Sequence, residues 1–145
     1  MRTVEWIARN KDKTDDRQRR FNSVIQDGRG TTYSYGGHYP LLFKLNGVWF
    51  INNRGYSVTT SKHISWAHQA VEYKGRNIRV PSDHAGRVTE AQAEQWLEDQ
   101  ATELVYTMLN KKRKNTQVYQ NLERELTDVK QSLKVLKGAS DGAIN

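Results

Sequence analysis

The stretch "LLFKLNGVWFINNRGYSVTT", residues 41–60, carries the strongest indication of the fold. Asn46-Gly47 separates two apolar runs, and this pair is the favoured centre of a two-residue type I′ hairpin turn. A second turn at 53–55 leads into "YSVTT", which we read as another strand. Together with "TTYSY" at 31–35, these segments predict an antiparallel meander of three or four strands.

Shorter segments on either side extend this predicted sheet. "TVEWIARN" (3–10) alternates loosely between apolar and polar residues and predicts a short strand, and "RFNSVIQ" (20–26) predicts a second. "IRVP" (78–81) predicts a third. Residues 11–20 are almost entirely charged or turn-forming, so we expect an exposed loop or tail there.

Two polar residues mark expected helix starts. Ser61 is the expected N-cap of a short amphipathic helix, because its hydroxyl can accept from the free amide groups of the first turn. The apolar face of that helix consists of Ile64, Ala67 and Val71. Thr89 opens a second helix, and Gln92 three residues later completes a capping-box pattern.

From residue 97 onward, apolar residues recur at spacings of three and four, which is typical of helices that pack along a seam. The seam consists of Leu97, Ala101, Leu104, Met108, Val118, Leu122, Leu126, Val129, Leu133 and Leu136. The segment "NKKRKNTQ" (110–117) interrupts it with four basic residues and neither glycine nor proline. The helix either runs through this segment or breaks there and folds back as a hairpin. Gly138 is expected to end the helix.

These patterns predict an α+β fold, in which a small antiparallel β-meander with one short helix precedes a long, coiled-coil-like C-terminal helix or helical hairpin. We expect a basic, aromatic-rich sheet domain at 1–88, a helical oligomerisation segment at 89–137 and a flexible tail at 138–145. The narrow seam favours self-association, most simply as a dimer, and the alternative is packing on the chain's own sheet. The expected interface residues are Leu122, Leu126, Val129, Leu133 and Leu136.

The charge is distributed unevenly along the chain. The 145 residues carry a net charge of +7, and residues 1–88 hold 15 Lys/Arg against 7 Asp/Glu, a net +8. A basic half favours an anionic partner such as nucleic acid, although a solvated basic surface explains it equally well. The absence of cysteine suits a reducing cytoplasm, and we expect neither a signal peptide nor a membrane span.

The segment "TTSKH" (59–63) is the first candidate site, because it stands where a strand is predicted to meet a helix. Free amide groups and the partial positive charge of a helix start would suit a phosphate or carboxylate. The alternative is that Ser61 only caps the helix while Lys62 points to water. The residues expected to bind an anion or nucleic acid are Thr59, Thr60, Ser61, Lys62, His63, Tyr33, Tyr35, Arg54, Arg76 and Arg79.

The histidines offer a second candidate site. If the meander brings His38 beside His63, the two could serve as acid and base in metal-independent RNA cleavage, with Lys62 stabilising the charged transition state. The alternative is that each histidine is an ordinary packing or polar residue. His63 and His68 are five residues apart, not the four that align two ligands on a helix, so no metal site and no cofactor is expected.

Aromatic residues interleave with basic ones in the first half of the chain, an arrangement that can stack nucleic-acid bases. We expect Phe43, Trp49, Phe50 and Trp66 to form the core of the small sheet. Tyr33, Tyr35 and Tyr39 are the better candidates for an exposed stacking surface.

Residues 33–71 resemble a module found in small uncharacterised proteins of bacteriophages and other mobile elements. The shared pattern is Y-S-Y-x(4)-P, then a hairpin, then Y-S-x-T-T-S-x-H. It falls here on Tyr33, Ser34, Tyr35, Pro40, Tyr56, Ser57, Thr59, Thr60, Ser61 and His63. That family has no assigned activity, so the resemblance implies a phage origin and a location in the cytoplasm of a bacterial host. It also makes a host-takeover or anti-defence role an expectation.

The leading functional hypothesis is therefore a non-enzymatic accessory protein of phage type that binds nucleic acid or a host nucleoprotein complex. Self-association through the C-terminal helix would add avidity. One alternative is the small ribonuclease that uses His38 and His63. Another is an inhibitor of a host defence enzyme, comparable to an anti-CRISPR protein, in which the positive charge is incidental.

Overall fold

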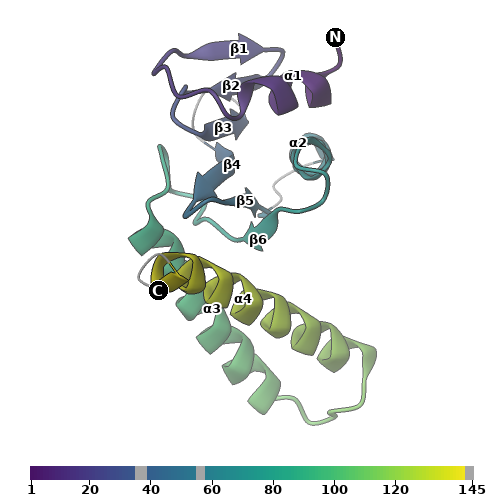
Figure 1. The fold of residues 1–145 in the computed structure, drawn as a ribbon. Coiled ribbons are helices and arrows are strands. Elements are labelled where there is room, and N and C mark those ends of the chain that lie inside the picture. The colour runs from purple at the N-terminus through teal and green to yellow at the C-terminus, as the bar shows by residue number, and fades with distance from the viewer. Residues whose placement is uncertain (35–38, 55–57, 143–145) are drawn as a thin grey trace.

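The computed structural model describes residues 1–34, 39–54 and 58–142, with the side chains of 58–60 and 139–142 left out of account. These residues form an α+β fold, as predicted, built on a six-stranded sheet whose spatial order β1-β2-β3-β4-β5-β6 follows the sequence (Figure 1). The strands are β1 (Arg19–Phe21), β2 (Val24–Gln26), β3 (Thr31–Ser34), β4 (Tyr39–Leu45), β5 (Val48–Asn52) and β6 (Arg76–Ile78). The helices are α1 (Thr3–Asn10), α2 (Val58–Ala70), α3 (Glu90–Leu109) and α4 (Gln117–Gly142).

The β4–β5 hairpin has the predicted two-residue turn. Asn46 and Gly47 both have positive φ, 51° and 76°, as a type I′ turn requires. The strands pair antiparallel, with Leu45 opposite Val48 and Phe43 opposite Phe50. The hairpin prediction is therefore confirmed.

Residues 3–10 form a helix, and the predicted strand is wrong. Thr3, Trp6, Ile7 and Asn10 are the buried residues of α1, and their spacing of three and four is helical. The loose alternation of apolar and polar residues that suggested a strand reflects the 3.6-residue period of a helix. This helix packs against α2, and the Trp6 and Ile7 side chains enter a core that α2 and the sheet share.

The predicted strand "RFNSVIQ" is divided in two. Asn22 has a φ of 54°, and the chain turns there so that β1 and β2 pair antiparallel. Asparagine tolerates this left-handed conformation better than most residues, because its short side chain can bond locally. Only the turn distinguishes this hairpin from one longer strand.

The prediction for "YSVTT" is also wrong where it can be checked. Residues 58–60 open α2, so Ser61 lies inside the helix and is not its N-cap, while 55–57 lie outside the described residues. The neighbour of β5 is instead β6, which pairs with it in parallel. A parallel neighbour requires a crossover connection, and α2 supplies it. The sheet is therefore mostly antiparallel with one parallel edge.

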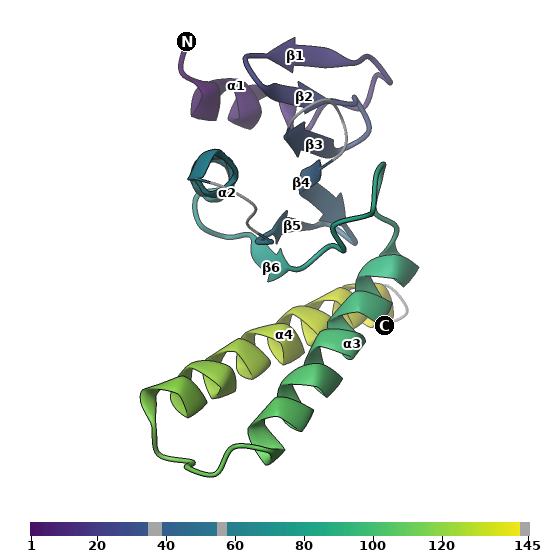
Figure 2. The same ribbon diagram turned by 180° about the vertical axis from the view of Figure 1, so that it is seen from behind.

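The sheet is buried on both faces where β4 and β5 run. On one face, Leu42 and Ile51 contact α1 and α2. On the other, Phe43 and Phe50 pack with residues from the base of the α3–α4 hairpin. Figures 1 and 2 show from opposite sides that this hairpin lies beside β5 and β6. Burial on both faces explains why the sequence of β4 is almost continuously apolar instead of alternating.

The C-terminal region is a helical hairpin, so the hairpin alternative is confirmed and the continuous helix is wrong. The predicted capping box opens α3: the Thr89 hydroxyl accepts from Gln92 N at 3.2 Å, and Gln92 Oε1 accepts from Thr89 N at 3.0 Å. The helices pack side by side and project away from the sheet (Figure 2). α4 continues past Gly138 to Gly142, so the predicted helix end is wrong.

The seam residues expected at an oligomer interface lie inside one chain. Val129 and Leu136 are buried in a core shared with α3 and the sheet. The partly buried members packed against that core are Leu122, Leu126 and Leu133. Packing on the chain's own sheet, the alternative left open above, accounts for the seam. Self-association remains a prediction that would need another surface.

Candidate functional site

The "TTSKH" segment (59–63) lies in the first turns of α2. It therefore lies near a helix start, as the predicted anion site requires. The Lys62 ammonium stands 5.1 Å from the centre of the Trp66 ring and is exposed, as is Ser61. The side chains of Thr59 and Thr60 lie outside the described part of the chain. Among the described side chains of this segment, Ser61 and Lys62 are exposed and His63 is buried.

His63 is a buried histidine with both ring nitrogens hydrogen-bonded. Its side chain is 1% exposed, Nδ1 meets Ser34 Oγ at 2.5 Å, and Nε2 meets Ser23 Oγ at 3.1 Å. Burial lowers the pKa of His63 below its usual value, and the charge of Lys62 lowers it further. A general acid or base must reach its substrate. The geometry therefore gives the ribonuclease hypothesis no support at His63, and His38 lies outside the described residues.

The tyrosines expected at the surface are buried where they are described. Tyr33 is 7% exposed, and burial, reinforced by Asp27, raises the pKa of its phenol to about 12. Tyr39 is 6% exposed, and its hydroxyl donates to Asn52 O at 3.1 Å and also to Arg54 O. Neither ring can stack on a base, so these two predictions are wrong. Tyr35 lies outside the described residues.

The four aromatic residues predicted to form the core differ in how deeply they are buried. Phe43 and Phe50 are fully buried and stack on each other, which confirms them as core residues. Trp49 and Trp66 are only partly buried, and they pack against the core that α1, α2 and the sheet share. The ammonium groups of Lys11 and Lys44 both lie over the Trp49 ring, at 5.1 and 5.6 Å from its centre.

Arg76 lies in a polar cluster with Asp128, His68 and Asn77, between β6, α2 and α4. Burial raises the pKa of Asp128, and the neighbouring charge of Arg76 opposes that rise. Burial also lowers the pKa of His68, although a hydrogen bond with Asn77 opposes it. The charge of Arg76 is therefore directed at a carboxylate of the same chain.

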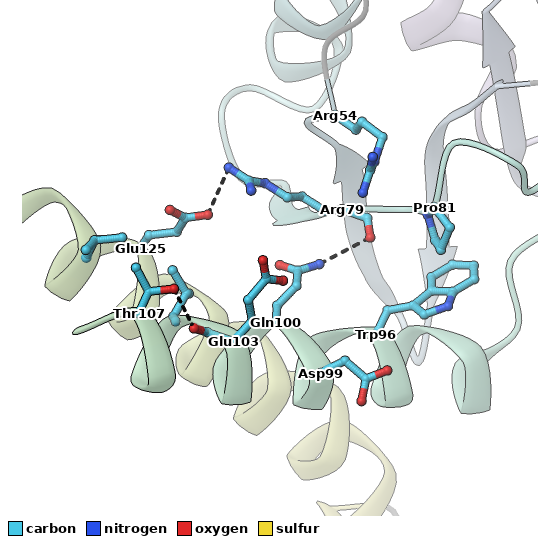
Figure 3. A pocket seen from close by; sticks show the side chains of 11 residues that line it. Arg54, Arg79, Pro81, Trp96, Asp99, Gln100, Glu103, Thr107 and Glu125 are labelled. Carbon is cyan, nitrogen blue, oxygen red and sulfur yellow. Dashed lines mark hydrogen bonds and ion pairs between the residues drawn. The ribbon is translucent and has the colours of Figure 1, made fainter. Parts of the chain in front are cut away.

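Arg54 and Arg79 are the two predicted residues that the structure brings to one place. They line a cleft of about 400 Å³ between the end of the sheet and the α3–α4 hairpin (Figure 3). The other lining residues are Pro81, Trp96, Asp99, Gln100, Glu103, Leu104, Thr107, Leu122 and Glu125. Three carboxylates and two guanidinium groups thus line the cleft, which makes it unsuited to a polyanion.

The two arginines differ in what they contact. Arg79 Nη2 lies 2.9 Å from Glu125 Oε1, and Gln100 Nε2 donates to the Arg79 carbonyl at 3.2 Å. Arg54 Nε is buried, and it has no hydrogen-bond partner in the described part of the chain. Buried polar groups nearly always have partners, so this one marks a position where a ligand or water can bind.

The hairpin tip, residues 105–119, is a surface that the sequence analysis treated only as a connector. Tyr106 and Leu109 are 70% and 73% exposed, and Val118 and Val105 are also largely exposed. Lys111, Lys112, Arg113 and Lys114 form the loop between them. No acidic residue occurs from 104 to 122, although both helices are rich in Asp and Glu elsewhere. This absence of acidic residues is visible in the sequence and could have indicated a basic surface.

The tip is built by hydrogen bonds of its own loop. Asn110 Nδ2 donates to Tyr106 O at 2.8 Å and ends α3, while the Thr116 hydroxyl accepts from Tyr119 N at 3.2 Å and starts α4. Lys114 Nζ donates to Met108 O at 2.9 Å and lies 5.4 Å from the centre of the Tyr119 ring. The remaining three basic side chains have no ion pair within the described residues. Lys112 and Arg113 are exposed, and Lys111 is half-buried.

Within the described part of the chain, no group of three or more histidine and acidic side chains is arranged to hold a metal ion. None of the helices described combines the length and apolar character that a bilayer crossing requires. Comparison with family models, curated proteins and solved structures finds no match.

Proposed function

We propose that the protein binds nucleic acid without catalysis and that the contact is the hairpin tip. The observation that carries this proposal is the coincidence, on a projecting tip without acidic residues, of an exposed tyrosine and basic side chains that form no ion pair among the described residues. Its charge is directed outward, whereas Arg76 and Arg79 on the body face carboxylates of the same chain.

Each component of the tip has a counterpart in nucleic acid. Lys111, Lys112 and Arg113 would neutralise phosphates and release bound counterions. The ring of Tyr106 would stack on an unpaired base, and such stacking contributes about 1–3 kcal/mol per base. A preference for single strands follows, because the bases of a duplex are already stacked on each other.

The phage setting implied by the resemblance belongs to the same proposal. A small protein that occupies single-stranded nucleic acid, or a host complex that contains it, would serve a host-takeover or anti-defence role. The exposed Leu109 and Val118 also suit a protein partner, and the experiment below separates these cases.

The experiment measures binding of fluorescein-labelled single- and double-stranded oligonucleotides, DNA and RNA, by anisotropy at several salt concentrations. Counterion release from three or four phosphate contacts predicts a slope of log affinity against log salt of about −2 to −3 for single strands. The double change Lys111→Gln with Lys112→Gln should reduce the magnitude of that slope by about 1.4, because each lost phosphate contact removes about 0.7.

The matched control is Lys130→Gln with Lys134→Gln, which removes the same charge from exposed positions of α4 below the tip. The proposal expects the control to bind like the unchanged protein. Equal losses in both variants would mean that only net charge matters, and the tip would not be the site. Failure to bind any oligonucleotide would favour a protein partner at the same surface. Binding to phosphatidylserine vesicles instead would favour an anionic membrane surface.

A further inference from the structure

The cleft between the sheet and the hairpin is independent of the tip, and its charges suggest a different ligand. We propose that this cleft binds a free α-amino acid, with Arg54 holding the carboxylate and Glu103 the ammonium group. The cleft's volume of about 400 Å³ lies within the range of small-molecule sites, about 300–1,000 Å³. This inference does not depend on nucleic-acid binding.

The carboxylate end is assigned to Arg54. Its side chain descends from the segment after β5 into the cleft, as Figure 3 shows, and its buried Nε has no partner among the described residues. A guanidinium group presents a planar fork of donors that matches a carboxylate in two parallel hydrogen bonds. A carboxylate in the cleft would meet the guanidinium group, and a shift of the Arg54 side chain would bring Nε, which has almost no accessible surface, within reach of the same carboxylate.

The ammonium end is assigned to Glu103. Its carboxylate rises from α3 toward the same space, whereas Asp99 points away from Arg54 (Figure 3). Glu125, the third carboxylate of the cleft, is already paired with Arg79 at 2.9 Å. Glu103 has no such partner within the described chain, so it is the carboxylate free to accept from a ligand ammonium group.

The side chain of the ligand would contact the apolar part of the lining. Trp96, Pro81, Leu104 and Leu122 supply this surface. The edge of the His84 ring packs against Trp96 with 5.0 Å between ring centres, which holds the indole in place. A preformed apolar wall beside opposite charges favours an amino acid with an apolar or aromatic side chain over glycine.

The charge balance excludes simpler ligands. With Arg79 and Glu125 paired, the cleft presents the guanidinium group of Arg54, which has no ion pair among the described residues, and the carboxylates of Asp99 and Glu103. A phosphate would meet these carboxylates, and a simple cation would meet Arg54. A molecule that carries both an anion and a cation would satisfy Arg54 and Glu103 together.

The test is a titration of the full chain with each proteinogenic L-amino acid, followed through amide ¹H–¹⁵N chemical shifts. The strongest binder is then compared with its N-acetyl derivative, which lacks the cation, and its methyl ester, which lacks the anion. We expect saturable shifts at cleft residues with a dissociation constant at or below about 1 mM, and each derivative weakened about 10-fold or more.

Two variants and a control complete the test. Arg54→Gln and Glu103→Gln should each weaken binding about 10-fold or more, while Arg124→Gln, exposed on α4 outside the cleft, should leave it unchanged. Shifts for no amino acid would overturn the proposal and leave water as the partner of Arg54. Equal binding of either derivative would also overturn it, because one end alone would then suffice.

Discussion

The two ends of the α3–α4 hairpin have the same helical backbone and opposite surroundings. At the base, Leu97 and Leu136 are buried against Phe43 and Phe50 of the sheet. At the tip, Tyr106 and Leu109 are exposed and four basic residues follow without an acidic one. Apolar residues of one hairpin thus stabilise the fold at its base and remain free for a partner at its tip. Leu97 and Leu136 belong to the buried seam, whereas Tyr106 and Leu109 lie outside it.

The largest expected effect is on stability, at the base. Leu136→Ala should lower the free energy of unfolding by about 2–5 kcal/mol, because it removes a fully buried side chain and leaves a cavity. Leu109→Ala, the same change at the tip, should alter it by less than about 0.5 kcal/mol. Urea denaturation measures both. Similar losses would show that the tip is packed in solution and would end the contrast between the two ends.

The next effect concerns pH and contrasts a buried histidine with the solvated tip. Because the pKa of His63 is lowered from 6.5 by burial, the unfolded chain binds a proton more readily than the folded one. The contribution of neutral His63 to the free energy of unfolding is full above about pH 6.5. It is lost as the pH falls below that value, by at most about 1.4 kcal/mol per pH unit.

His63→Gln should therefore flatten the loss of stability between about pH 7 and pH 5, even if the variant is less stable throughout. Part of the slope will remain, since burial lowers the pKa of His68 as well. Urea midpoints measured across this range provide the comparison. An unchanged slope in the variant would mean that His63 is not buried in its neutral form.

The third effect is expected in nucleic-acid affinity with the fold unchanged. Tyr106→Ala should weaken single-strand binding by about 1–3 kcal/mol, through loss of stacking, and leave the salt slope as it is. Tyr73→Ala is the control, since Tyr73 is exposed to a similar degree on the body of the protein. Anisotropy titrations of both variants decide the matter. Equal weakening would show that neither aromatic residue defines the site.

The smallest expected effect is a gain in stability. Ser132 is fully buried on α4, and its hydroxyl has no hydrogen-bond partner in the described chain. Ser132→Ala should raise the free energy of unfolding by up to about 1 kcal/mol, because it removes an unsatisfied polar group. Ser65→Ala, at an exposed position of α2, should change little. A loss of stability at Ser132 would indicate a bound water that the hydroxyl needs.

The parts of the fold that the sequence revealed are those fixed by local chemistry. Asn46-Gly47 defines its turn, and Thr89 with Gln92 defines its helix start, because each signal acts within a few residues. The segment 3–10 was misread because eight residues are too few to separate the two periods. The start of α2 and the parallel β6 depend on packing between distant segments, which the sequence does not display.

The candidate site was harder to predict than the fold. His63 and Tyr33 have the chemistry of functional residues, and only tertiary burial removes them from solvent. Arg79 meets Glu125, 46 residues later in the chain, through packing of α4 near β6. The tip could have been found, because the absence of acidic residues from 104 to 122 is visible in the sequence. It was overlooked because a basic connector between helices is ordinary.

A map of where nucleic acid contacts the folded chain would test binding at the hairpin tip directly. Amide ¹H–¹⁵N spectra recorded during titration with a short single-stranded DNA would locate the contact residue by residue. Binding at the hairpin tip predicts shifts concentrated at residues 105–119 and little change at Lys62 or Arg76. Shifts centred on α2 and β6, with the tip unaffected, would contradict it and return the site to the sheet domain.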